Sequence, residues 1–165
     1  MLRPKVCLLA LGILLLAGCG DDEAGSLTAP GEGITRQIAG SWAGTLQQGR
    51  LPPFKIAVDI TSNGTARVAY TGIECGGDWT LDGVRPSIPP RYVFTEKINQ
   101  GPGGTCKGAG MVSLSPIQGH LPNRPAYTRL NYRFTGGGVA SRGLLHRIHA
   151  GAEAPTFEQA GVTPP

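Results

Sequence analysis

The side chains that could do chemistry are few and scattered along this chain of 165 residues. His146 and His149 are three positions apart, so on a β-strand they point to opposite faces and cannot hold one metal ion together. His120 stands alone in a loop rich in Gly and Pro. The sequence shows no carboxylate pair, Ser-His-Asp arrangement or phosphate-binding loop in a supporting context. It therefore predicts a protein that is not an enzyme and uses no metal or cofactor.

The N-terminus has the pattern of an exported protein. Arg3 and Lys5 form a short positive region, and the apolar run over residues 6–16 is too short to span a bilayer comfortably. This pattern is typical of a secretory signal rather than a membrane anchor. We expect the chain to act outside the cytoplasm, where nucleic acid is not an expected partner.

The residues that end this segment add a second signal. The tetrapeptide Leu16-Ala17-Gly18-Cys19 resembles the lipobox of bacterial lipoproteins. The resemblance implies that residues 1–18 are removed and that the Cys19 thiol carries acyl chains, which anchor a protein almost permanently when two or more are present. Because Gly20 stands where the enterobacterial inner-membrane retention signal has Asp, both the cell membrane and an outer membrane stay open as locations. The alternative is an ordinary secreted protein.

This assignment leaves two cysteines for the mature chain. Cys7 lies in the discarded signal and Cys19 is acylated, so Cys75 and Cys106 are expected to form a disulfide in the oxidising compartment. The cross-link closes a loop of about thirty residues, which is worth roughly 3.5 kcal/mol in the chain-entropy treatment. We interpret it as structural, because the spacing is not Cys-x-x-Cys.

The elements that must position these residues are short strands. Apolar and polar residues alternate in short runs separated by Gly and Pro, most clearly over residues 54–60. Asn63-Gly64 comes next, a strong hairpin signal that makes 54–60 and the following strand antiparallel neighbours. In all, the pattern predicts eight strands, near residues 41–47, 54–60, 66–70, 79–81, 92–98, 112–114, 130–134 and 139–148.

These strands predict an all-β fold. The chain has 26 Gly and 14 Pro, too many for a helix bundle. We expect an eight-stranded antiparallel up-and-down β-barrel over residues 39–149, because closure removes exposed sheet edges. A two-sheet β-sandwich is the alternative, since alternation does not distinguish the two. Residues 19–38 are expected to be a flexible tether and 150–165 a disordered tail.

A short motif favours the barrel. Gly40-Ser41-Trp42 resembles the Gly-x-Trp opening of lipocalin-like and avidin-like barrels. In lipocalins this tryptophan closes one end and packs against an arginine of the last strand, and the resemblance implies that Arg147, or failing that Arg142, is the partner of Trp42. The wider layout is similar to small extracytoplasmic domains of unknown function in bacterial lipoproteins and membrane kinases, which implies an architecture and no activity.

The barrel interior is expected to be filled. The alternation turns eight of the ten aromatic side chains inward, and each buries something like 150 to 250 Å², so a packed core is favoured over a deep ligand cavity. Gly108 and Gly110 could open a pocket or permit a tight bend. Glu96 is the one charge on the apolar face, and a buried carboxylate needs a partner. We expect that partner to be Arg147, in a structural pair or as the floor of a polar site.

The charge of the expected domain bears on its partners. Residues 40–149 hold twelve Lys or Arg and five acidic residues, with the arginines 124, 129, 133, 142 and 147 in the last third. Such a body would be attracted to anionic lipids or envelope polymers, or is simply well solvated. The sequence thus favours a non-catalytic binding or accessory module that takes an apolar small molecule, an envelope polymer or a protein. A purely structural domain with a filled core, and an inhibitor of a wall-degrading enzyme, are the alternatives.

Overall fold

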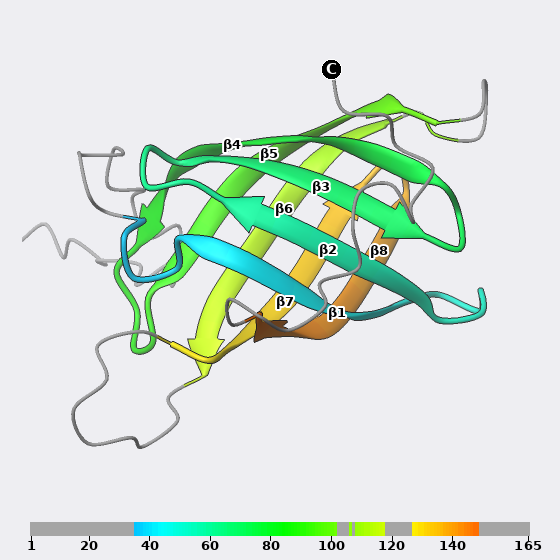
Figure 1. The fold of residues 1–165 in the computed structure, drawn as a ribbon. Coiled ribbons are helices and arrows are strands. Elements are labelled where there is room, and N and C mark those ends of the chain that lie inside the picture. The colour runs from blue at the N-terminus through cyan, green and yellow to red at the C-terminus, as the bar shows by residue number, and fades with distance from the viewer. Residues whose placement is uncertain (1–34, 102–105, 107, 118–126, 149–165) are drawn as a thin grey trace, which may run out of the picture.

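The protein is a closed barrel of eight antiparallel strands, each paired with the next and the last paired with the first (Figure 1). The computed structural model describes residues 35–101, 106, 108–117 and 127–148. The strands are β1 (Gly40–Gln48), β2 (Phe54–Ile60), β3 (Thr65–Thr71), β4 (Cys75–Arg85), β5 (Arg91–Gln100), β6 (Gly108–Ile117), β7 (Arg129–Gly136) and β8 (Val139–Arg147). This topology confirms the up-and-down barrel over the sandwich. No helix in these ranges is long and apolar enough to cross a bilayer.

The expected hairpin joins β2 and β3. Their register pairs Val58 with Val68 in an antiparallel ladder. Gly64 adopts a φ of 87° in the turn, a conformation that glycine takes without steric cost, and the Thr61 amide donates to the Thr65 carbonyl at 2.8 Å. Alternate residues of β2, including Ile56 and Val58, are buried. The period-two pattern therefore identified the inward face of this hairpin.

The seam that closes the barrel lies between β1 and β8. Trp42 pairs with Arg147 and Gly44 with Leu145 across it. A Cβ atom on Gly44 would lie 2.1 Å from the backbone oxygen of Leu144, so only glycine allows the two strands to approach this closely. Gly44, two residues after the Trp42 of the Gly-x-Trp motif, is thus required by the close approach of β1 and β8.

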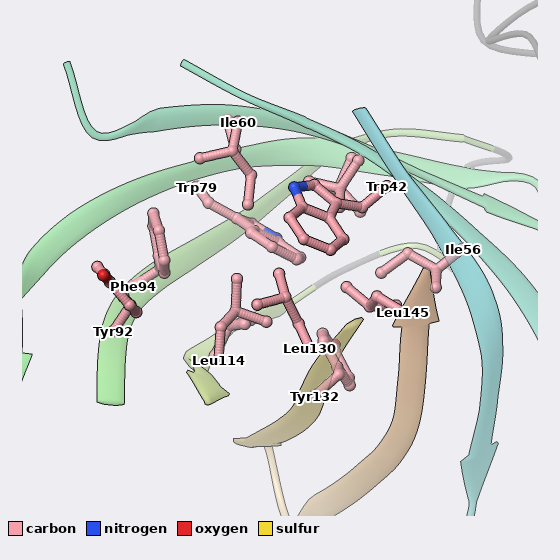
Figure 2. Packing of buried hydrophobic residues seen from close by; sticks show 14 of the residues in the cluster. Trp42, Ile56, Ile60, Trp79, Tyr92, Phe94, Leu114, Leu130, Tyr132 and Leu145 are labelled. Atoms are coloured by element: carbon pink, nitrogen blue, oxygen red, sulfur yellow. The ribbon is translucent and has the colours of Figure 1, made fainter. Parts of the chain in front are cut away.

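Large apolar side chains from several strands fill one half of the interior. Figure 2 shows them converging on the barrel axis, with Trp42 and Trp79 among them. The ring centroid of Trp79 lies 5.8 Å from that of Phe94 and 6.0 Å from that of Tyr132. The fully buried members, each 0% exposed, are Trp42, Ile56, Trp79, Phe94, Val112, Leu114, Leu130 and Leu145. The predicted aromatic core exists in this half.

The folded domain begins earlier than expected. Residues 35–38, which the sequence placed in the tether, form a turn against the barrel. Thr35 and Ile38 are 0% exposed, and the Thr35 hydroxyl donates to the Ser62 carbonyl at 2.7 Å. The boundary at residue 39 was therefore wrong, because composition cannot show that a short polar segment covers an end of the barrel. The rest of the predicted tether and the tail from 150 lie outside the described residues.

Candidate functional site

The two ends of the barrel differ. At one end, which we call the closed end, Trp42 lies under the turn over residues 35–38, and its Nε1 donates to the Ile38 carbonyl at 2.8 Å. The other end, which we call the open end, is where β1, β3, β5 and β7 finish and β2, β4, β6 and β8 begin. The two ends therefore offer separate sites, one plugged and one accessible.

Arg147 completes the closed end. Its guanidinium carbon lies 4.4 Å from the centroid of the Trp42 ring, a cation–π contact of the kind that the motif implied. Its three nitrogens donate to backbone carbonyls: Nε to Tyr127 at 2.8 Å, Nη1 to Ala39 at 2.7 Å and Nη2 to Gln37 at 3.0 Å. Burial lowers the pKa of Arg147 from its ordinary value. The side chain thus fastens the segment before β1 and the residues just before β7 to the last strand.

The expected pairing of Glu96 with Arg147 is wrong. Glu96 does point inward and is 3% exposed, but its Oε1 accepts hydrogen bonds from the Tyr70 hydroxyl and from Nε1 of Trp79, the latter at 2.7 Å. Arg147 instead uses all its nitrogens on carbonyls at the closed end. The alternation correctly predicts which face carries Glu96, but the position along the barrel axis depends on the stagger between strands.

A cavity of about 290 Å³ occupies the open half of the barrel. Its apolar wall is formed by Leu46, Phe54, Ile73, Ile98, Phe134 and Val139. Its polar side chains are Gln48, Tyr70, Glu96, Tyr132 and Ser141. The expectation of a packed interior is therefore wrong for this half. Four of the eight inward aromatic residues line the space without filling it, and the other four do not line it.

The two glycines of strand β6 act differently. Gly108 lines the cavity, and a Cβ atom placed on it would have no described neighbour within 4 Å, so this glycine leaves space at the mouth. A Cβ on Gly110 would lie 2.3 Å from the ring of Phe134, so this glycine lets the ring pack against the sheet. Gly108 thus fits the first sequence alternative, an open pocket, whereas Gly110 makes room for a ring and not for the tight bend that was the second.

A small hydrogen-bonded cluster forms the polar part of the cavity wall. Glu96 accepts a hydrogen bond from the Tyr70 hydroxyl, and the hydroxyl oxygens of Tyr70 and Tyr132 are 3.4 Å apart. Sequence reasoning counted both tyrosines as filling and missed the cluster. The available signal was the choice of Tyr over Phe at inward positions, since a buried hydroxyl usually finds a partner.

Burial controls the protonation of this cluster. It raises the pKa of the Glu96 carboxyl, and the hydrogen bonds from Tyr70 and Trp79 oppose that shift. Burial also raises the pKa of Tyr70 and of Tyr132, so both hydroxyls keep their protons. Glu96 is therefore the group of the cluster that can change its charge in the acidic to neutral range.

A Glu96→Gln substitution should stabilise the protein at neutral pH and lose this advantage in acid. Because the pKa of Glu96 is higher in the folded than in the unfolded chain, the folded state holds the proton more tightly. The protonated carboxyl therefore stabilises the folded state below the ordinary pKa of 4.5. This contribution is lost as the pH rises through the folded-state pKa of Glu96. Glutamine keeps an oxygen that can accept both hydrogen bonds and carries no charge.

Chemical unfolding of both proteins at about pH 4 and about pH 7 measures this difference. Glu74→Gln, which changes an exposed carboxylate in the β3–β4 turn, serves as the control. An advantage of Glu96→Gln that is equal at both pH values would contradict the assignment.

The predicted disulfide closes part of the cavity mouth. Cys75 and Cys106 are bonded, with their Cα atoms 5.4 Å apart, and both line the cavity. The bond ties the start of β4 to the β5–β6 connection. It therefore stabilises the fold and also shapes the entrance.

The predicted arginine group divides in two. Arg129, Arg133 and Arg142 are exposed on the outside of the barrel, and the register places Arg133 opposite Arg142. Arg147 instead turns to the closed end, and Arg124 lies outside the described residues. The structure thus brings together three of the five as one basic face.

These features define a class of protein, a small closed barrel that is plugged at one end and has a cavity at the other. Within the described part of the chain, no group of three His, Cys, Asp or Glu residues is placed to hold a metal ion. His146 is exposed on β8, and His120 and His149 lie outside the described residues. Comparison of the chain with protein-family models, curated proteins and solved structures gives no match.

Proposed function

We propose that this protein is a lipid-anchored binding module of the bacterial cell envelope, which takes a small, mostly apolar molecule into the cavity at its open end. The observation that carries the proposal is the cavity itself, with apolar walls and a few polar groups gathered around Glu96. Ligand sites in proteins typically have this composition.

The size of the cavity limits the ligand. About 290 Å³ lies near the lower end of the range for ligand pockets. A water molecule takes about 30 Å³ of liquid, so the space corresponds to roughly ten non-hydrogen atoms. This favours a compact molecule or one end of a longer chain.

The described lining favours binding over catalysis. Ser141 is the one serine or threonine in this described lining, and it is 6% exposed. Its hydroxyl donates to the amide oxygen of Gln48 at 2.8 Å. A nucleophile needs a base beside it, and no His is among the described lining residues. The proposed role is therefore non-catalytic.

Filling the cavity should remove the bound molecule. We expect native mass spectrometry of protein extracted from membranes to show a small-molecule adduct that Ile98→Trp abolishes, because Ile98 lines the cavity. Lys97→Trp is the matched control, since Lys97 is the preceding residue of β5 and is exposed. An adduct equally abundant in the Ile98→Trp protein, or absent from the natural protein, would overturn the proposed function.

The anchor has its own test. Acylation at Cys19 predicts that the mature chain begins at this residue and incorporates labelled palmitate, as the tetrapeptide Leu16-Ala17-Gly18-Cys19 suggests. Cys19→Ser should lose the label, whereas Cys7→Ser should keep it. Residues 1–18 retained on the mature natural protein would refute the lipid anchor.

A further inference from the structure

We propose that the cavity selects a molecule with a cationic amine at one end and a short apolar body. This inference rests on the proposed function and names the class of ligand. The geometry behind it is a buried carboxyl group in a cavity whose described lining is rich in aromatic rings and holds no other charged side chain. Within this described lining, the free oxygen of the carboxyl, its unpaired charge and the surrounding rings each restrict the chemistry of the ligand.

The carboxyl of Glu96 has one oxygen in use and one available. Both hydrogen bonds from described residues, those of Tyr70 and Trp79, go to Oε1. Oε2 receives none from the described residues, and Glu96 lines the cavity. A ligand group can therefore donate a hydrogen bond to Oε2, while the bonds to Oε1 hold the carboxyl group in place.

The described surroundings hold no counter-ion for the charge of Glu96. No Lys, Arg or His is among the described residues that line the cavity. Arg147, the cation that the sequence suggested, is bound to carbonyls at the closed end. A buried carboxylate is strongly destabilised unless it is paired, so a cation brought by the ligand would offset this cost.

Aromatic rings around the carboxyl favour the same head group. Phe54 and Tyr70 meet edge to face, with ring centroids 6.0 Å apart, and both line the cavity together with Tyr132 and Phe134. The faces of aromatic rings attract ammonium groups, most strongly where water is excluded. Leu46 and Ile98 then provide contact for an apolar body.

Other head groups match the site less well. A carboxylate would be repelled by Glu96 in a medium of low polarity. A hydroxyl can donate to Oε2 but leaves the charge uncompensated, whereas an ammonium group both donates a hydrogen bond and compensates the charge. The three head groups should therefore bind in the order amine, alcohol, carboxylate.

Three probes of equal chain length test this order: hexylamine, 1-hexanol and hexanoate. The full-length acylated protein is placed in phosphatidylcholine nanodiscs, and binding is measured by isothermal titration calorimetry with empty nanodiscs as the blank. We expect hexylamine to bind at least about tenfold more tightly than 1-hexanol, with hexanoate weakest. In Glu96→Gln the amine should lose that advantage, whereas the affinity for 1-hexanol should change less than about twofold.

The possible results separate the two proposals. Equal affinities for amine and alcohol, or an amine preference that survives in Glu96→Gln, would overturn the amine inference and leave a neutral binding cavity in place. If none of the probes binds and native mass spectrometry shows no adduct, both proposals fail. Should Glu96→Gln not fold, the comparison of the three probes on the natural protein still decides the inference.

Discussion

A Trp42→Ala substitution should lower the free energy of unfolding by about 3 to 5 kcal/mol, as is typical for truncation of a large buried aromatic side chain. Trp42 is 0% exposed, so the change leaves a cavity in the packed half of the barrel. It also removes the Nε1 hydrogen bond to the Ile38 carbonyl and the ring beneath the Arg147 guanidinium. Since domains are stable by only about 5 to 15 kcal/mol, this is a large share of the total.

Urea unfolding measures this loss, and two variants separate its causes. Trp42→Phe keeps a ring for Arg147 but no N–H group, so it should cost less than Trp42→Ala. Thr45→Ala, at an exposed position of the same strand, should change stability by no more than about 0.5 kcal/mol. A loss below about 1 kcal/mol for Trp42→Ala would contradict the plugging role of the closed end.

Removal of the disulfide should have an effect of similar size. A Cys75→Ser and Cys106→Ser double variant should be less stable by about 3.5 kcal/mol, because the loop closed by the bond, with a sequence separation of 31, becomes free in the unfolded chain. For a domain of this size the melting temperature should fall by about 15 °C. Serine keeps the side chains small, so the native packing around them is little changed.

Thermal melting with and without reductant provides the measurement and its control. Reductant should lower the melting temperature of the natural protein to that of the double variant, and should leave the variant unchanged. If the natural protein melts at the same temperature in both conditions, the bond contributes nothing to stability.

The strands could be predicted because their pattern is local. Inward residues such as Ile56 and Val58 repeat every second position, and Asn63-Gly64 joins two such runs at a turn that suits few other residues. The disulfide followed from the compartment and from the number of cysteines left over. The contact of Trp42 with Arg147 followed from the resemblance of three residues to a known barrel opening, and the structure has the same contact.

The partner of Glu96 could not be predicted, for a geometric reason. Alternation places Glu96 and Arg147 on the same inner surface but does not say how high either lies in the barrel. The register pairs Glu96 with Trp79 and Arg147 with Trp42, so the two charges belong to different levels. The height of each residue follows from the stagger of strands that are far apart in the sequence.

The sequence by itself determined the strands and their inward faces, because these depend on short-range pattern. The number of cysteines determined the disulfide, and the resemblance to a known barrel opening indicated the tryptophan that closes one end. Only the tertiary structure decided that the interior is packed at one end and hollow at the other. A count of large inward side chains gives only the total volume that they fill in the barrel. A cavity depends on where along the axis the large rings and the glycines lie. The same closure brings Tyr70, Glu96 and Tyr132 from three different strands into one cluster.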